Sequence, residues 1–344
     1  MAEPNTLERN PVSVPPSKWV GHQKRATERT RAPKWTAVLV LVALCCALPL
    51  LSSDYTLFQY SQVYCYAIVL LGLNILTGYN GQISIGHGAF YAIGGYTTAI
   101  ALERWGIAYG WTVPLSGVLC FIVGFLFGLP ALRLEGTYLA LATFALALAV
   151  PQILKHYDHW TGGTQGLVVP KPDSPHFLKL NSDQWLYFIT FAILLLLTLA
   201  AWNLLRSRVG RAIIAIRDNP VAAEAMGIHN AVYKSMCFGL SASYTGIAGS
   251  LAALSVGFVS PDSFSAWLSI TLLVGIVVGG LGSISGAMLG ALFIQFMPSV
   301  ALEISKSAPW AIYGLSLIVC MYLLPGGLAS LLERGWQLAA RRFS

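Results

Sequence analysis

The stretch that decides how this chain is built runs from Arg206 to Lys234, reads RSRVGRAIIAIRDNPVAAEAMGIHNAVYK, and interrupts a sequence that is otherwise almost continuously apolar. A plain connector between membrane helices needs only a few turn residues. This stretch instead combines apolar residues at helical spacing with charged ones, so we expect it to rest against something cytoplasmic. We predict a docking surface with an apolar stripe of Ile213, Ile216, Val221 and Ala225 beside the charged residues Arg211, Arg217, Asp218 and Glu224.

Two signals inside this stretch predict a short separate helix. Asn219 precedes Pro220; asparagine can cap a helix N-terminus, and proline is favoured at the first helical position. Gly227 is the residue type that ends helices in left-handed backbone. We expect about two turns, lying along the membrane surface and able to enter a groove on another protein. Asp218 and Glu224 weaken the alternative of a helix resting on lipid, because an anionic leaflet repels them.

The composition is that of a membrane protein. Of the 344 residues 56% are hydrophobic and only 10% charged, with a mean hydropathy of +0.66, whereas a soluble domain is roughly 25% charged. Because a spanning helix takes about 20 apolar residues, one membrane domain over residues 35–324 accounts for nearly the whole chain. We predict an all-α integral membrane protein, a bundle of about ten transmembrane helices over the apolar runs 35–51, 57–76, 83–102, 111–129, 138–154, 184–205, 232–257, 267–281, 284–302 and 309–324.

The basic residues predict the orientation, because loops rich in Lys and Arg stay in the cytoplasm. They gather in an N-terminal arm, in the Arg206 to Lys234 stretch and near the C-terminus. This distribution indicates that orientation in the lipid bilayer, and not binding of nucleic acid, explains the net charge of +7. We expect a multi-pass protein with both termini cytoplasmic. Its parts are a mostly disordered, uncleaved arm over residues 1–34, a cytoplasmic loop over 206–231, a tail over 325–344, and an outer loop over 156–183 that faces either a soluble partner or solvent.

A short motif occurs twice. Residues 78–84 read GYNGQIS and residues 279–285 read GGLGSIS. Both copies fall at predicted cytoplasmic hairpins, and paired glycine interruptions in two halves of a transporter point to its central pathway. Close helix packing explains small residues equally well, and the sequence leaves both interpretations open.

Polar residues inside membrane spans are costly and call for a reason. The densest set surrounds the glycine-rich segment GYNGQISIGHGAFYAIGGY, where irregular backbone can line a cavity. We predict that this segment lines a translocation path, although His87 taken alone is better explained as an imidazole packed against a neighbouring helix. The predicted path residues here are Asn74, Gly78, Gly81, Gln82, Ser84, Gly86 and His87.

A second cluster follows Glu135, which the helix dipole already stabilises at a helix start. Thr137, Tyr138 and Thr143 are expected to point inward or to bond the backbone, and we add them to the path.

The chain carries no phosphate-binding loop, no HExxH or GxSxG motif and no spacing typical of a metal site. We therefore expect no catalytic residue, no metal and no cofactor bound by this chain, with the energy supplied elsewhere.

Four stretches carry a resemblance to a known family: LGLNILTGYNGQISIGHGAFYAIGGY (71–96), LEGTYLALATFAL (134–146), TGGTQGL (161–167) and GRAIIAIRDNPVAAEAMGI (210–228). Over about residues 63–324 the chain resembles the permeases of high-affinity branched-chain amino acid ABC importers, of the Liv-type M subunit. The resemblance implies a non-enzymatic permease of the bacterial inner membrane, working by alternating access. It also implies that ATPase coupling involves Arg211, Arg217, Asp218, Asn219, Pro220, Glu224 and Gly227.

The same resemblance implies the partners. These are a paralogous permease subunit, or a second copy, two ATPase subunits that use ATP, and a periplasmic binding protein. Many relatives carry an acidic residue after the ATFAL-like run, whereas this chain continues with Ala147, so urea, short amides and aromatic or dicarboxylic compounds remain alternative substrates. An ion-coupled secondary transporter would need buried charges in the spans, and a membrane enzyme would need clustered titratable residues.

Overall fold

The computed structural model describes residues 42–49, 52–132, 134, 136–174 and 180–331. The chain divides into two compact units, residues 1–51 and residues 52–344, which are treated separately. In the first unit, residues 42–49 are helical, inside the predicted span 35–51. The predicted arm over residues 1–34, Glu135 and residues 332–344 of the predicted tail lie outside the described residues.

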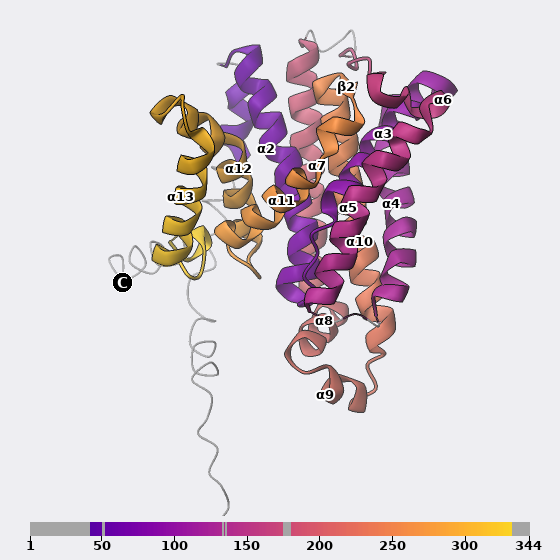
Figure 1. The fold of residues 1–344 in the computed structure, drawn as a ribbon, viewed down its shortest axis with the longest axis vertical. Coiled ribbons are helices and arrows are strands. Elements are labelled where there is room, and N and C mark those ends of the chain that lie inside the picture. The colour runs from indigo at the N-terminus through magenta and orange to yellow at the C-terminus, as the bar shows by residue number, and fades with distance from the viewer. Residues whose placement is uncertain (1–41, 50–51, 133, 135, 175–179, 332–344) are drawn as a thin grey trace, which may run out of the picture. The chain divides into compact units, whose positions relative to one another are not determined.

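The second unit is built almost entirely of helices (Figure 1), as predicted. In chain order its elements are α2 (Asp54–Leu73), the π-helix η1 (Asn74–Tyr79), α3 (His87–Trp105), α4 (Tyr109–Ala131), α5 (Thr137–His156), α6 (Asp158–Thr161), the 3-10 helix η2 (Gly163–Gln165), β1 (Leu167–Val168), α7 (Ser182–Arg206), α8 (Arg208–Asp218), α9 (Pro220–Ala225), α10 (Asn230–Val256), β2 (Phe258–Val259), the 3-10 helix η3 (Pro261–Phe264), α11 (Ala266–Gly279), α12 (Ile284–Ile304) and α13 (Pro309–Leu323).

Within the described ranges, six helical segments are long and apolar enough to cross a membrane, so the count of about ten is not confirmed. The six are 54–79, 109–130, 137–156, 182–206, 230–256 and 284–304. Two further apolar helices, α11 and α13, are shorter than a typical span. The predicted span 83–102 corresponds to α3, which begins only at His87 and is more polar than the six.

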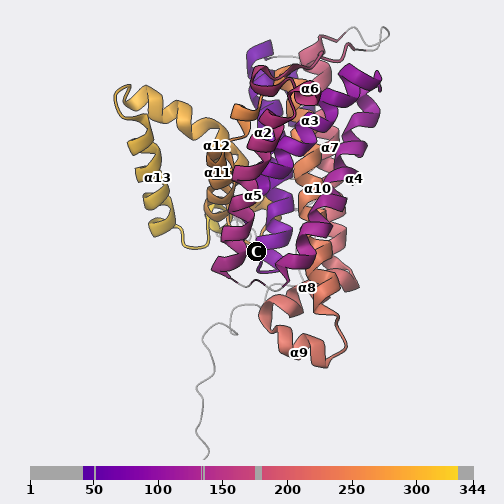
Figure 2. The same cartoon turned by 45° about the vertical axis from the view of Figure 1, so that its right-hand side comes forward.

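Helix α10 holds the second unit together by packing against α4, α3 and α2 (Figures 1 and 2). It is rich in glycine, alanine and serine, and such small residues let membrane helices approach closely. A Cβ added at Gly246 would collide with the Cys120 thiol of α4, and one added at Gly249 would collide with the carbonyl oxygen of Tyr91 in α3. The small residues of α10 therefore set its distance from two neighbouring helices.

This packing predicts a stability difference between two Gly→Ala substitutions. Gly246→Ala forces a Cβ against α4 and should lower the free energy of unfolding by about 1–3 kcal/mol, the usual range for overpacking. Gly314→Ala in α13 is the matched control, because an added Cβ there meets nothing within 4 Å. Titration of the purified variants with SDS measures both values. Equal stability of the two variants would contradict the close contact of α10 with α4.

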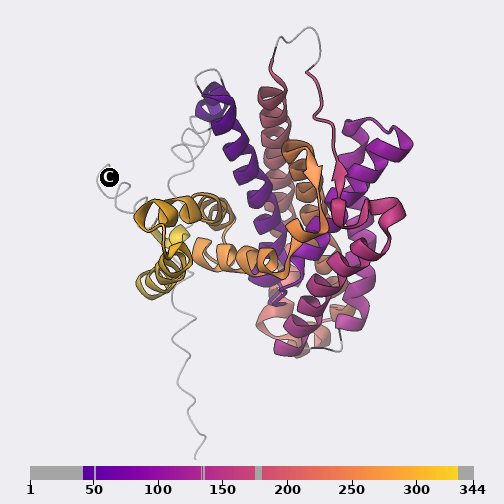
Figure 3. The ribbon, with the colours of Figure 1, turned by 45° about the horizontal axis from the view of Figure 1, so that its top comes forward.

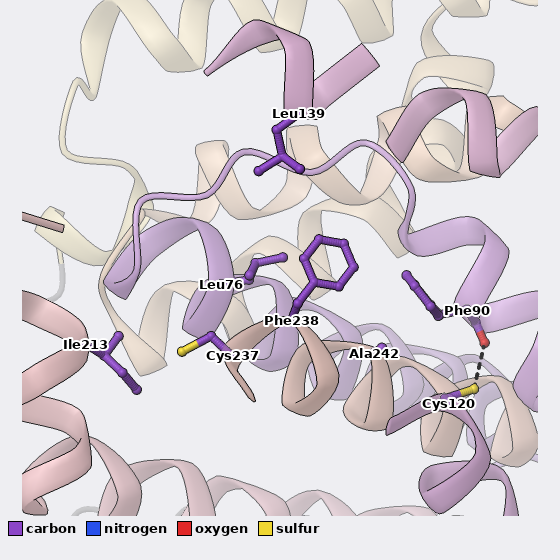
Figure 4. Packing of buried hydrophobic residues seen from close by; sticks show 8 residues of the cluster. All are labelled: Leu76, Phe90, Cys120, Leu139, Ile213, Cys237, Phe238 and Ala242. Carbon is purple, nitrogen blue, oxygen red and sulfur yellow. Dashed lines mark hydrogen bonds between the residues drawn. The ribbon is translucent and has the colours of Figure 1, made fainter. Parts of the chain in front are cut away.

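A buried cluster links several of these helices (Figure 4). Phe238 and Cys237 of α10 lie among Leu76 of η1, Phe90 of α3 and Leu139 of α5. The picture shows Ile213 of α8 at one edge of the cluster and Cys120, whose thiol lies 3.5 Å from the carbonyl oxygen of Phe90, at the other. Helix α8 is thus part of the same core as the long helices.

The two ends of the second unit differ. Figures 1 and 2 place α6 and β2 at one end and α8 and α9 at the other. At the first end, β1 and β2 pair antiparallel, with Leu167 opposite Val259 (Figure 3), and Lys155 forms an ion pair of 2.6 Å with Asp262. These contacts fold part of the predicted outer loop 156–183 back on to the segment after α10.

Candidate functional site

Helix α8 begins at a sharp turn after α7. The hydroxyl of Ser207 accepts hydrogen bonds from the N–H groups of Val209 (3.1 Å) and Gly210 (3.4 Å), which caps the new helix. Ile213 and Ile216 are 1% and 2% exposed. The apolar face of α8 is therefore buried in the core of the second unit.

Helix α9 has the start and the end that its sequence predicts. The side chain of Asn219 accepts a hydrogen bond of 3.0 Å from Ala222 N–H, Pro220 is the first helical residue, and Gly227 has a φ of +84°. The amide of Asn230 closes the loop by donating to the carbonyl oxygen of Pro220 (2.8 Å) and to Glu224 (3.4 Å). The short helix is therefore held in shape from both ends.

The predicted single apolar stripe is wrong. Ile213 and Ile216 face the core from α8, whereas Val221 is 76% exposed on α9 and Ala225 is also exposed. The extended backbone of Asn219 separates the two helices, so the helical period does not continue across it. Val221, Glu224 and Met226, the last of them 83% exposed, instead all face outward.

The first copy of the repeated glycine motif is a break between α2 and α3. Here η1 gives way to an irregular segment over residues 80–86, in which Gly81 has a φ of +76°. The hydroxyl of Thr77 donates to the carbonyl oxygen of Gln82 over 3.0 Å and closes the turn. The break thus lies at the end of α2 and delays the start of α3 to His87.

The second copy is a break between α11 and α12, and Asn74 joins it to the first. Asn74 is 1% exposed. Its Nδ2 donates to the carbonyl oxygen of Ser283 (2.7 Å), and its Oδ1 accepts from Gly282 N–H (2.8 Å). Gly282 has a φ of +76°, a conformation that glycine adopts readily. Two motifs 200 residues apart in sequence therefore meet in space.

Arg217 connects α8 to the same place. Its Nη1 donates a hydrogen bond of 2.7 Å to the carbonyl oxygen of Gly78, and its Nε lies 3.4 Å from a carboxylate oxygen of Asp218. A Cβ added at Gly81 would lie 2.9 Å from Cγ of Arg217, so the side chain also packs against the break. Three segments, α8 and the two glycine breaks, are thus in direct contact.

Most of the rest of the glycine-rich segment is buried, although Ile83 is exposed and Gln82 is partly exposed. His87, 1% exposed, bonds through Nδ1 to the hydroxyl of Ser84 (3.1 Å) and through Nε2 to the hydroxyl of Ser241 in α10 (2.6 Å). Gly86 leaves no room for a Cβ against the carbonyl oxygen of Thr143. The interpretation of His87 as an imidazole packed against a neighbouring helix is confirmed.

The predicted residues of α5 separate into two groups. Thr143 is buried and bonds the backbone, because its hydroxyl donates to the carbonyl oxygen of Ala140 (2.9 Å) and accepts from Ile85 N–H (2.9 Å). Thr137 and Tyr138 do not point inward: both are exposed, Tyr138 by 71%. They occupy the first turn of α5, on the side away from the buried residues Leu139 and Ala140 of the same turn.

The structure therefore brings Asn74, Gly78, Gly81 and Arg217 together, with Asp218 beside Arg217. Arg211, exposed on α8, donates to the carbonyl oxygen of Arg206 over 3.4 Å. Sequence reasoning missed Ser241, Ser283 and Gly282 as partners; only the repeated motif contained a signal, and that for the last two. Among the described residues, no three His, Cys, Asp or Glu side chains are grouped so as to hold a metal ion.

These observations define a class: a helical protein with several membrane spans, whose two glycine breaks are joined to a protruding helical loop. Residues 55–324 match the family described as branched-chain amino acid transport system, permease component. The chain belongs to this family and is a multi-pass membrane protein.

Individual relatives agree with this assignment. The chain is 32% identical over 314 residues to the high-affinity branched-chain amino acid transport system permease protein LivM of Escherichia coli (strain K12), covering 85% of this chain and 74% of that protein. It is 27% identical over 248 residues to LivH of the same strain, covering 67% and 79%. It is 26% identical over 299 residues to the autoinducer 2 import system permease protein LsrC of Salmonella typhi, covering 80% of each. No solved structure matches the chain.

Proposed function

We propose that this chain is the transmembrane permease subunit of an ABC importer and forms part of the path for branched-chain amino acids. The proposal includes a periplasmic binding protein that delivers the substrate, a paralogous permease subunit that completes the pore, and two ATPase subunits that use ATP. The chain itself contributes no ATPase activity and binds no cofactor. It would lie in the bacterial inner membrane with the α8–α9 loop and both termini in the cytoplasm.

The observation that carries the proposal is the construction of α9. A six-residue helix is too short to be stable alone, yet this one is capped by Asn219, closed by Asn230 and carried on a helix whose other face is buried. Val221, Glu224 and Met226 are all exposed on it. A rigid, exposed short helix with apolar and acidic side chains is suited to enter a groove on a partner, here the ATPase.

Charge burial favours an external energy source over an ion gradient. Ion-coupled transporters place Asp, Glu, Lys or Arg side chains inside the membrane domain. In the part of the chain that the structure describes, the buried polar side chains are Ser, Thr, Asn, Gln and His only. The second candidate, a secondary transporter, therefore lacks the groups on which it would depend.

The relatives bear on the substrate. Identity is higher to the branched-chain amino acid permease LivM (32%) than to the autoinducer 2 permease LsrC (26%). This difference favours an aliphatic amino acid over a different small polar compound. The resemblance to LivM and LivH, two permeases named for the same transport system, also favours a paralogue over a second copy as the pore partner.

Reconstitution tests the proposal. The chain, its paralogous permease and its candidate ATPase are placed in liposomes with the candidate binding protein outside, and uptake of labelled leucine and hydrolysis of ATP are measured together. Val221→Asp changes the exposed surface of α9 alone, and Glu224→Lys changes that surface and also removes the 3.4 Å hydrogen bond from Asn230. Both should reduce stimulated hydrolysis and uptake about tenfold, the effect of losing roughly 1.4 kcal/mol of interaction with the ATPase.

The matched control is Glu303→Lys, the same charge reversal at an exposed position near the end of α12, which should behave as the unaltered chain. If leucine-loaded binding protein stimulates neither hydrolysis nor uptake by the unaltered complex, the proposed function or substrate is wrong. If the unaltered complex works and both α9 variants work equally well, α9 is not the ATPase contact.

A further inference from the structure

We propose that Asn74 and Arg217 form a transmission junction, which moves the two glycine breaks together when the α8–α9 loop moves. The junction comprises Arg217, Asn74 and the backbone at Gly78, Gly282 and Ser283. The inference rests on the proposed function, since it concerns how motion imposed by an ATPase would reach the membrane helices. It makes Asn74 and Arg217 positioning residues, with no contact to substrate required.

The first link runs from the loop to the break after α2. Arg217 is the penultimate residue of α8, directly before the turn into α9. Its guanidinium donates to the carbonyl oxygen of Gly78, and its stem lies against Gly81. A charged donor on a backbone carbonyl is stronger than a neutral one. A displacement of α9 therefore reaches residues 78–81 through one side chain that is anchored at two points.

The second link runs from that break to the one before α12. Asn74 uses both ends of its amide, donating to Ser283 and accepting from Gly282. The side chain is planar, with its donor and acceptor fixed relative to each other, so it holds the second break at two neighbouring peptide groups. An aspartate at position 74 could accept but not donate, and an apolar residue could do neither.

The two breaks also touch directly. A Cβ added at Gly78 would overlap Oδ1 of Asn74 and come within 2.6 Å of the Gly282 nitrogen. Beyond the second break, the hydroxyl of Ser283 caps α12 by accepting from Gly286 N–H at 3.3 Å. Since α12 packs against α2 and α11, a shift of residues 282–283 reaches these three helices.

The burial pattern makes α8 a suitable lever. Ile213 of α8 lies in the same buried cluster as Leu76, which stands two residues before Gly78 in η1. The apolar contact keeps α8 in place against η1. Arg217, with a side chain 44% exposed, lies at the solvent-exposed end of α8. Motion at the exposed end can thus change the polar links without separating the two helices.

The test uses the complete reconstituted complex, with leucine as the transported probe, and compares uptake per ATP hydrolysed. Arg217→Met keeps the aliphatic stem against Gly81 and removes the donor, and Asn74→Leu keeps the size of the side chain and removes both hydrogen bonds. Each should lower the uptake-to-hydrolysis ratio about tenfold, within the range of measured couplings between sites. Arg217→Lys restores a donor and should recover most of the ratio.

Arg208→Met is the matched control. It removes the same charged group from an exposed position in the first turn of α8, away from both breaks, and should leave the ratio unchanged. Amide hydrogen exchange provides a second readout, because Asn74→Leu frees Gly282 N–H and should speed exchange over residues 279–286 but not over 239–249 in α10.

The outcomes separate the two proposals. A complex with the unaltered chain that shows no stimulated hydrolysis and no uptake contradicts the proposed function. An active unaltered complex whose Arg217→Met and Asn74→Leu variants keep its uptake-to-hydrolysis ratio contradicts the junction alone. The junction is also wrong if uptake and hydrolysis fall in parallel and Arg217→Lys rescues neither, because that pattern describes loss of folded complex.

Discussion

Replacing Gly78 with alanine should abolish coupled transport, with leucine uptake falling about a hundredfold, near the upper end of known couplings between sites. The added Cβ has no space: it meets the side-chain amide of Asn74, which is held by two hydrogen bonds, on one side and the Gly282 backbone on the other. Neither neighbour is the loose end of a flexible side chain. The two breaks must separate, and Asn74 and Arg217 then lose their common position.

Gly110→Ala is the control for this substitution. Gly110 stands near the start of α4, where a Cβ meets nothing within 4 Å, so uptake should be unchanged. Thermal unfolding of both purified variants shows whether the loss is one of coupling or of folding. Normal uptake by Gly78→Ala would mean that the two breaks are not held in contact during transport.

The second large effect, a loss of folding stability, is expected when His87 is replaced. Its imidazole bonds Ser84 on one side and Ser241 of α10 on the other, in a fully buried place. Leucine fills a similar volume, but it cannot form the hydrogen bonds that His87 makes with the hydroxyls of Ser241 and Ser84. His87→Leu should therefore lower the free energy of unfolding by about 3 kcal/mol, since leaving buried polar groups unpaired costs their desolvation.

A double-mutant cycle gives the decisive comparison. Removing both polar partners is less costly than removing one, so His87→Leu combined with Ser241→Ala should recover part of the lost stability. SDS titration of the two single variants and the double variant measures the coupling between the residues. Unchanged stability in His87→Leu together with altered substrate preference would instead assign His87 to the translocation path.

The local features of the loop could be predicted from the sequence because their causes are local. An asparagine followed by proline, then glycine seven residues later, determines where α9 begins and ends. Which side chains of α9 are exposed could not be inferred in the same way. Val221 and Ala225 continue the apolar spacing of α8 in sequence, but a change of chain direction at Asn219 turns them outward.

The contacts that join the site are long-range, which is why they escaped prediction. Asn74 and Gly282 are separated by 208 residues, and a hydrogen bond to a backbone group leaves no trace in the residue type of its partner. The repeated motif signalled that the two breaks matter and did not say that they meet. Likewise, hydropathy identifies apolar runs but not their boundaries, so it missed the late start of α3 at His87.

The π-helical turn that ends α2 adds a mechanical property to this region. Asn80 N–H donates to the carbonyl oxygen of Ile75, five residues earlier, over 3.2 Å, so the turn holds one residue more than an α-helical turn. One residue of α-helix corresponds to about 100° of rotation and about 1.5 Å of rise. Conversion of this π-helical turn to an α-helical turn would therefore rotate the backbone that follows it by one residue and would leave the rest of α2 wound as it is.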